Sequence, residues 1–93
     1  MGYVIYDKQL EQIKASGYES RQEAISSFAE YWRHIARDDE LRDLEETGKL
    51  TNQESTEERE KILAQWRTET FSNDLEYIES YDFEVREEKN DWT

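Results

Sequence analysis

Residues 10–37, LEQIKASGYESRQEAISSFAEYWRHIAR, constrain the fold of this chain more than any other stretch. Leu10 and Ile13 lie three residues apart and Gly17 follows them. This order is typical of a short helix that is closed by a glycine in the left-handed conformation. Asp7 is a suitable N-cap for that helix. The sequence therefore predicts a short helix after Asp7 and a turn at Gly17.

A longer amphipathic helix is predicted after this turn. Ser20 stands three residues before Glu23, so the two side chains can form a capping box. Apolar residues then recur at helical spacing, namely Ala24, Ile25, Phe28, Trp32, Ile35 and Ala36. We expect this helix to begin at Arg21 and to bend near Asp38. The alternative is one continuous helix that ends at Glu46 and has a polar middle.

The pattern L-x-x-I-x-x-x-G-Y-x-S-R-x-E-A-I over residues 10–25 resembles the core of ribbon-helix-helix proteins. That family contains small dimeric repressors and the DNA-binding halves of antitoxins. The resemblance implies a strand that pairs with the same strand of a second subunit and enters the DNA major groove. It also implies that Ser20 and Arg21 contact phosphate at a helix N-terminus, and that Gly17 is the turn between helices.

The strand that the resemblance requires would be residues 2–6, GYVIY. In the family's arrangement Tyr3 and Ile5 point inward, which leaves Gly2 and Val4 facing DNA. Neither residue has an amide or a guanidinium with which to read a base edge. The resemblance therefore predicts the fold of a DNA-binding protein without its base-reading side chains.

The rest of the chain also favours helices. Two overlapping capping boxes, Thr51-x-x-Glu54 and Ser55-x-x-Glu58, precede a helix that we expect from about Thr56 to Phe71. A short helix with Leu75 and Ile78 follows. We predict one mainly α domain over residues 1–93, with three to five helices and room for a short strand at each end. The expected core is Ile25, Phe28, Trp32, Ile35, Ile62, Leu63 and Trp66.

Charge divides the chain into two parts. The net charge is −12, yet residues 1–37 hold five bases and five acids and are neutral. Residues 38–93 carry the whole excess, mainly in blocks at 38–46 and 74–93, and residues 87–93 form a charged tail. Charge of this sign repels a phosphate backbone and attracts basic protein surfaces. The second part is therefore expected to bind a basic protein, or else to act as a solvating surface.

The chain offers few residues for catalysis or metal binding. It has no cysteine, and its one histidine, His34, lies on the polar face of the long helix. Glu30, His34 and Asp38 follow at i, i+4 and i+8, but a third ligand two turns away does not close one metal site. There is no glycine-rich phosphate loop and no serine elbow. We expect no enzyme activity, no metal and no cofactor.

Neither a membrane span nor a secretory signal is visible in the sequence, so we expect a cytoplasmic protein. Only 34% of the residues are hydrophobic. A chain of this size would be helped by a dimer or a bound partner.

Two functions are consistent with these features. We favour a non-enzymatic acidic protein that binds and neutralises a basic protein partner such as a nuclease, a toxin or another nucleic-acid-binding protein, as phage inhibitors, DNA mimics and antitoxins do. The alternative is a dimeric ribbon-helix-helix regulator of transcription.

Residues 81–86 alternate aromatic or apolar with charged side chains, which suits an edge strand or a segment that orders on a partner. The expected partner-binding residues are Asp38, Asp39, Glu40, Asp43, Glu79, Tyr81, Asp82, Phe83 and Glu84.

Overall fold

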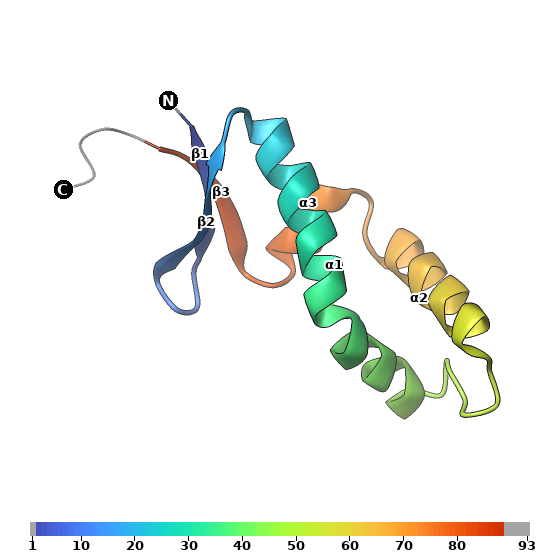
Figure 1. Ribbon diagram of the computed structural model, residues 1–93. Coiled ribbons are helices and arrows are strands. Elements are labelled where there is room, and N and C mark those ends of the chain that lie inside the picture. The colour runs from blue at the N-terminus through green and yellow to red at the C-terminus, as the bar shows by residue number, and fades with distance from the viewer. Residues whose placement is uncertain (1, 89–93) are drawn as a thin grey trace.

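The computed structural model describes residues 2–88 of the chain. In order, these residues form β1 (Tyr3–Asp7), β2 (Gln12–Tyr18), α1 (Arg21–Glu46), α2 (Thr56–Thr70), α3 (Asp74–Glu79) and β3 (Phe83–Glu87). Figure 1 shows the sheet at one end of the molecule and the pair formed by α1 and α2 at the other. The described chain is elongated, with principal extents of 53 × 23 × 19 Å. All of the predicted tail beyond Glu88 lies outside the described residues.

The three strands form an antiparallel sheet in the order β2-β1-β3. Ile5 pairs with Val85 of β3 on one side and with Ala15 of β2 on the other, where the register is irregular. Alternation along β1 turns Tyr3 and Ile5 toward α1 and leaves Val4 and Tyr6 on the opposite face. The strand nearest the N-terminus is thus the centre of the sheet, and β2 and β3 are its edges.

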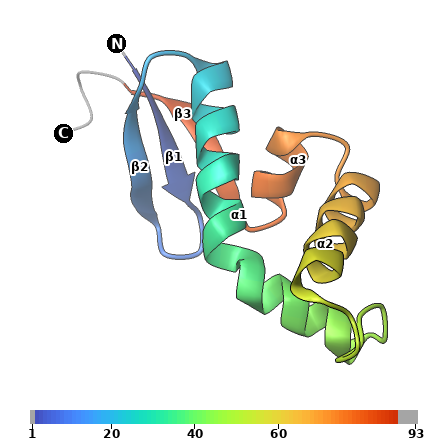
Figure 2. The same ribbon diagram turned by 45° about the vertical axis from the view of Figure 1, so that its right-hand side comes forward.

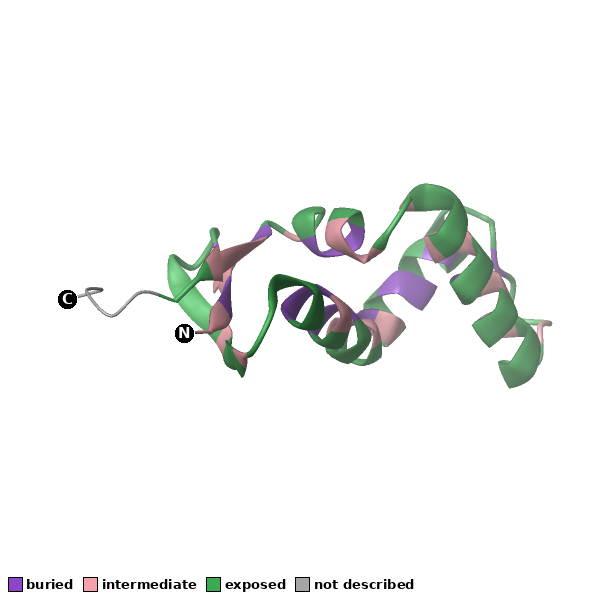
Figure 3. Cartoon of the chain, turned by 90° about the horizontal axis from the view of Figure 1, so that it is seen from above, coloured by how far each residue is buried: buried purple, intermediate pink, exposed green. Residues whose placement is uncertain are grey.

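The main core lies between this sheet, α1 and α3. Figure 3 shows the buried sides of the helices turned toward each other. Aromatic rings fill much of the space: the ring centroids of Phe28 and Phe83 are 4.9 Å apart, and those of Trp32 and Phe83 are 4.8 Å apart. The buried residues of this core are Ile5, Ala24, Ile25, Phe28, Ala29, Tyr77, Ile78 and Phe83.

The prediction of a mainly α domain is wrong. Residues 2–88 combine three helices with a three-stranded antiparallel sheet, so the fold is mixed α and β. The short strands that were allowed for at the two ends of the chain are present as β1 and β3. Strand β2 was not predicted.

Strand β2 occupies residues that were predicted to be helical. The helix was inferred from the three-residue spacing of Leu10 and Ile13, but these side chains are 62% and 47% exposed and form no buried stripe. The carboxylate of Asp7 caps a turn instead of a helix, because its Oδ1 accepts from the amides of Gln9 and Leu10 at 2.9 and 3.1 Å. The chain then reverses and pairs with β1, which local spacing cannot reveal.

Helix α1 is continuous from Arg21 to Glu46, as the alternative of one helix predicted. The apolar pattern is interrupted near Asp38 because a buried position of the helix is occupied by Glu40, whose exposed fraction is 2%. Backbone hydrogen bonding therefore persists through the polar segment. Figure 2 shows that the axis of the helix changes direction partway along, in its green part.

Both predicted helix starts are confirmed. The hydroxyl of Ser20 accepts from the Glu23 amide at 3.0 Å, and the Ser55 hydroxyl accepts from the Glu58 amide at 3.2 Å. The returning carboxylate of Glu23 binds the amide of Glu19 at 2.7 Å instead of that of Ser20. Helix α2 consequently begins and ends within one residue of its predicted bounds.

The helical pair has its own small core. Leu41 and Leu44 of α1 pack with Leu50 and Leu63, and Trp66 lies partly buried against them. The predicted core is thus largely correct, with one clear error: Ile35 is 48% exposed. No helix among residues 2–88 is long and apolar enough to cross a membrane.

Candidate functional site

The acidic residues that were predicted to bind a partner gather mainly on the projecting helical pair. We call residues 38–61 the acidic arm: the second half of α1, the connection after it, and the first half of α2. This segment holds ten acids and four bases. Because it extends away from the sheet (Figure 1), most of its surface is open to a partner.

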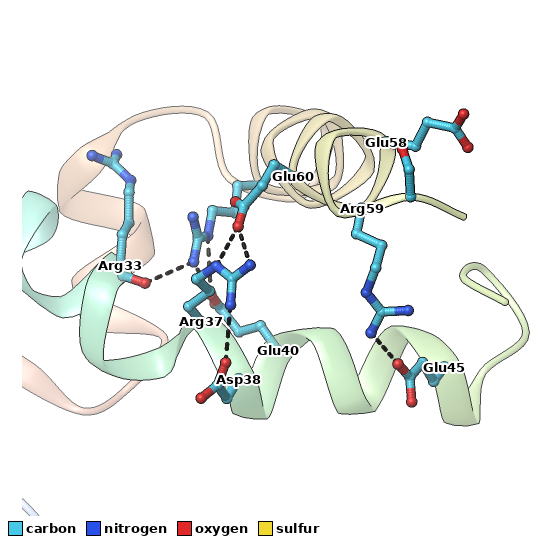
Figure 4. Close-up of polar contacts among 10 residues, drawn as sticks. Arg33, Arg37, Asp38, Glu40, Glu45, Glu58, Arg59 and Glu60 are labelled. Atoms are coloured by element: carbon cyan, nitrogen blue, oxygen red, sulfur yellow. Dashed lines mark hydrogen bonds and ion pairs between the residues drawn. The ribbon is translucent and has the colours of Figure 1, made fainter. Parts of the chain in front are cut away.

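Two arginines lie between the two helices, whereas Arg42 and Lys61 are 64% and 77% exposed. Arg37 of α1 binds Glu60 of α2, and Arg59 of α2 binds Glu45 of α1. Figure 4 shows these guanidinium groups in the space between α1 and α2. The bridges join the helices and at the same time keep these two guanidinium groups between them. The surplus carboxylates are left on the outside.

The outward acids are highly exposed. The side chain of Asp38 is 91% exposed and contacts Arg37 at 3.0 Å, and that of Asp39 is 75% exposed and contacts Arg42. Asp43 is also exposed. Among the described residues, no lysine or arginine forms an ion pair with Asp43, Glu46, Glu54 or Glu58. The outside of the arm therefore carries net negative charge.

Two apolar side chains lie next to these acids on α1. Tyr31 is 55% exposed and Ile35 is 48% exposed. They are four residues apart, and Asp38 and Asp39 follow after one further turn, so all four side chains share one side of the helix. The Tyr31 ring packs against Phe28, with 5.9 Å between centroids, which holds it in place. We call Tyr31, Ile35, Asp38, Asp39 and Asp43 the outer α1 face.

Sequence reasoning missed the apolar half of this face. Ile35 was predicted to be core, because it continues the stripe of Phe28 and Trp32 at helical spacing. The signal that separates Ile35 from the core residues is the next turn of the helix. Asp38 and Asp39 lie on the same side as Ile35 there, and a side that carries two aspartates faces water.

Three of the predicted partner-binding residues lie in the interior instead. Glu40 and Phe83 are 2% and 3% exposed, and Tyr81 is half-buried. Glu40 accepts from Arg67 Nε at 2.9 Å, from the Tyr77 hydroxyl at 3.2 Å and from the Tyr81 hydroxyl at 2.8 Å. This cluster joins α1, α2 and α3. Its members are therefore structural in the free protein and are not available to a partner.

Burial and the neighbouring carboxylate change the acidity of the two phenols in this cluster. Burial, followed by the charge of Glu40, raises the pKa of Tyr77 to about 12. Burial and the hydrogen bond to Glu40 raise the pKa of Tyr81 well above its ordinary value. Both hydroxyls therefore remain protonated donors to Glu40 throughout the neutral range.

The other predicted acids lie at a different place. Glu79 ends α3 and is exposed, Asp82 accepts from the Gln9 amide group at 2.7 Å, and Glu84 of β3 pairs with Arg86 at 2.9 Å. These residues lie on α3, on β3 and beside the β1–β2 turn, not on the outer α1 face. The structure thus separates the predicted set into two groups, and the group on α1 lies beside Tyr31 and Ile35, which are 55% and 48% exposed.

Ser20 and Arg21, the alternative phosphate contacts, lie at the start of α1. Ser20 is the N-cap, and Arg21 is exposed. The strand that would pair with a second subunit in a ribbon-helix-helix dimer is β1, which already has β2 and β3 on its two sides.

A pocket of about 340 Å³ lies between the three helices. It is lined by Arg33, Arg67, Phe71, Asp74 and Tyr77 among others. Arg33 pairs with Asp74, and Arg67 pairs with Glu40, so its charges compensate one another. Among residues 2–88, no three histidine, aspartate or glutamate side chains are grouped as metal ligands.

Comparison of the chain with models of protein families, with curated proteins and with solved structures finds no match.

Proposed function

We propose that this chain is a non-enzymatic acidic protein that binds and neutralises a basic protein, and that the outer α1 face is its contact surface. One observation carries the proposal. Arg37 and Arg59 are held between α1 and α2, while Asp38, Asp39 and Asp43 remain outside beside the exposed Tyr31 and Ile35. The surface therefore combines apolar anchors with net negative charge.

The two kinds of side chain would have different roles in binding. Exposed carboxylates attract a basic partner and accelerate its association, whereas desolvated aromatic and aliphatic side chains govern dissociation. Tyrosine is well suited to such a contact, since it buries a large ring and loses little conformational freedom. The expected binding mode is a helix face placed against an apolar groove that is bordered by lysine and arginine.

Proteins that handle nucleic acids fit this description of a partner. Their binding sites carry clusters of lysine and arginine that contact phosphate. A rigid helix that presents carboxylates at regular spacing would compete with the nucleic acid for such a site. Inhibition would then require no chemistry, only occupation of the basic surface. A nuclease, a toxin or another nucleic-acid-binding protein meets these requirements, and an antitoxin is one form that the proposed function would take.

The dimeric DNA-binding regulator remains the alternative. Its support is the resemblance of residues 10–25, and a measurement of DNA binding separates it from the proposed function. The cytoplasmic location also remains a prediction.

The proposed function is tested by affinity capture from the source cell with the full chain as bait. The matched bait carries Asp38→Lys, Asp39→Lys and Asp43→Lys. We expect the wild-type chain, but not the charge-reversed variant, to retain a basic nucleic-acid-handling protein at low salt, and to inhibit that protein's purified activity. Equal retention on both baits, or capture without inhibition, would contradict the proposal.

A further inference from the structure

We propose that two copies of this chain pair antiparallel along the free edges of β2, so that their two three-stranded sheets become one continuous sheet. This inference is independent of the proposed function. It concerns the free edge of the sheet at β2, whereas the proposed partner binds the outer α1 face.

The first argument is that β2 is the most accessible strand. It is an edge of the sheet and has seven residues, against five in each of the other strands. Five of its seven residues are exposed. An edge strand of this kind presents unpaired amide and carbonyl groups to which another strand can bond. β1 has no free edge, so a pairing through β1 would require the sheet to come apart.

The second argument is electrostatic and identifies the partner strand. A copy of a chain with net charge −12 is repelled by most of its surface, but residues 1–37 are neutral. The only charged residue of β2 is Lys14. The opposite edge, β3, contains Glu84, Arg86 and Glu87 and has a net charge of −1, so a copy with net charge −12 is repelled more by it than by the single lysine of β2. A second copy can therefore approach most closely at β2.

The third argument is the position of exposed apolar surface. The described residues have four large exposed hydrophobic side chains, and two of them lie at this end of the sheet: Leu10 is 62% exposed and Ile13 is 47% exposed. Ile13 belongs to β2, and Leu10 lies in the turn before it. A two-fold pairing of β2 places both side chains close to the new interface on each copy.

The arrangement of the elements leaves room for this pairing. Figure 2 shows β2 at the outer side of the sheet, away from α2 and α3. Two copies joined at β2 would hold their acidic arms at opposite ends of the dimer, where the arms repel each other least. The dimer would also present two outer α1 faces.

The test is sedimentation velocity of the full chain over a wide concentration range. Two variants form a matched pair: Ile13→Glu in β2 and Ile35→Glu on α1, whose native side chains are 47% and 48% exposed. Both change the net charge by the same amount. We expect wild type and Ile35→Glu to dimerise alike, and Ile13→Glu to dimerise about tenfold more weakly because two carboxylates meet at one interface. Circular dichroism checks that both variants are folded.

A second measurement does not depend on a disruptive substitution. The chain has no cysteine, so Ile13→Cys, Lys14→Cys, Ala15→Cys and Ser16→Cys in β2, and Ser27→Cys on the exposed side of α1, each introduce a single thiol. In a two-fold antiparallel pair, residues that face their own counterparts bring their Cα atoms within disulfide range, and the four positions cover the registers centred on the middle of β2. We expect mild oxidation to link one of the β2 variants into a dimer faster than Ser27→Cys. A wild-type chain that remains a monomer at all concentrations, equal effects of the two glutamate variants, or equal rates of cross-linking would each overturn the proposal.

Discussion

The Tyr81 hydroxyl donates a 2.8 Å hydrogen bond to Glu40 Oε2, although the two residues are 41 positions apart in the chain. Tyr77 donates to the same oxygen at 3.2 Å, and Arg67 Nε donates to the other oxygen at 2.9 Å. Arg67 also donates to the backbone carbonyl of Arg33 at 3.0 Å. Glu40 is thus a buried acceptor that joins α1, α2, α3 and the segment before β3. These donors fulfil the hydrogen-bonding needs of the buried carboxylate. Removal of any one of them would leave a buried charge that is less well stabilised.

The first prediction follows from this dependence. Arg67→Met leaves the Glu40 carboxylate in the interior without its cation, so we expect it to lower the free energy of unfolding by about 3–5 kcal/mol. The double variant Arg67→Met with Glu40→Leu removes the buried charge as well, and we expect it to be more stable than Arg67→Met alone. Urea unfolding of the three proteins measures this. A double variant less stable than the single variant would contradict the prediction.

The second prediction concerns alkaline pH. The ordinary pKa of tyrosine is about 10, whereas that of Tyr77 in the folded chain is about 12. The folded state therefore holds a proton that the unfolded state loses, and stability falls as pH rises. This contribution is fully present below about pH 10 and is lost between about pH 10 and 12. Tyr81, whose pKa is also raised, adds to the effect.

The measurement is the free energy of unfolding in urea across this pH range. We expect the decline above pH 10 to be shallower in the Tyr77→Phe, Tyr81→Phe double variant than in wild type, because neither ring then titrates. The double variant will be less stable at neutral pH, since Glu40 loses two donors, but the slope with pH is the quantity compared. Equal slopes would show that these phenols do not couple to folding.

Local chemistry predicted the parts of this fold that depend on neighbouring residues. The caps at Ser20 and Ser55 and the bounds of α2 are correct because a hydroxyl and an amide three residues later interact regardless of the rest of the chain. The alternation at residues 81–86 was consistent with an edge strand or with a segment that orders on a partner, and Phe83–Glu87 form the edge strand β3. Its aromatic side faces the core, whereas the sequence allowed it to face a partner equally well.

Long-range partners account for what could not be predicted. β2 exists because residues 12–18 pair with β1, and no local pattern in that segment distinguishes the strand from a helix. Glu40 was predicted to be a surface acid because it lies within Asp38-Asp39-Glu40. The donors that make its burial tolerable come from residues 67, 77 and 81. Of the outer α1 face, the sequence pointed to the acids Asp38, Asp39 and Asp43, whereas Ile35 was assigned to the core.

The third prediction tests that assignment. Phe28→Ala removes a fully buried ring and should lower the free energy of unfolding by about 3–5 kcal/mol. Ile35→Ala truncates a side chain that is 48% exposed, and we expect a change within about 0.5 kcal/mol. Thermal unfolding of the two variants provides the comparison. A large loss of stability for Ile35→Ala would mean that this residue belongs to the core after all.

The fourth prediction separates the proposed function from the DNA-binding regulator. We expect no measurable binding of duplex DNA near physiological salt, because the net charge is −12 and phosphate contacts dominate DNA affinity. Electrophoretic mobility shifts with random duplexes test this, with Arg21→Ala as the control for the phosphate contact that the resemblance implies. A sequence-specific shift that weakens with salt and is lost in Arg21→Ala would favour the regulator.

The fifth prediction divides the outer α1 face into steering and anchoring side chains, and it uses the basic protein captured from the source cell. Reversing Asp38, Asp39 and Asp43 to lysine should slow association and flatten its dependence on salt, since exposed charges act mainly on the encounter. Tyr31→Ala and Ile35→Ala should leave association nearly unchanged and accelerate dissociation, since these side chains lose contact area only in the bound state. Binding kinetics at two salt concentrations measure both rates.

The chain supplies a matched control for the anchors. Leu10 and Ile13 are about as exposed as Tyr31 and Ile35, but they lie in β2 and in the turn before it, not on α1. At concentrations at which the chain is monomeric, Leu10→Ala and Ile13→Ala should therefore leave both rate constants for the partner unchanged. If these two variants accelerate dissociation while Tyr31→Ala and Ile35→Ala do not, the partner binds at the sheet, and the acids of α1 act only as a solvating surface.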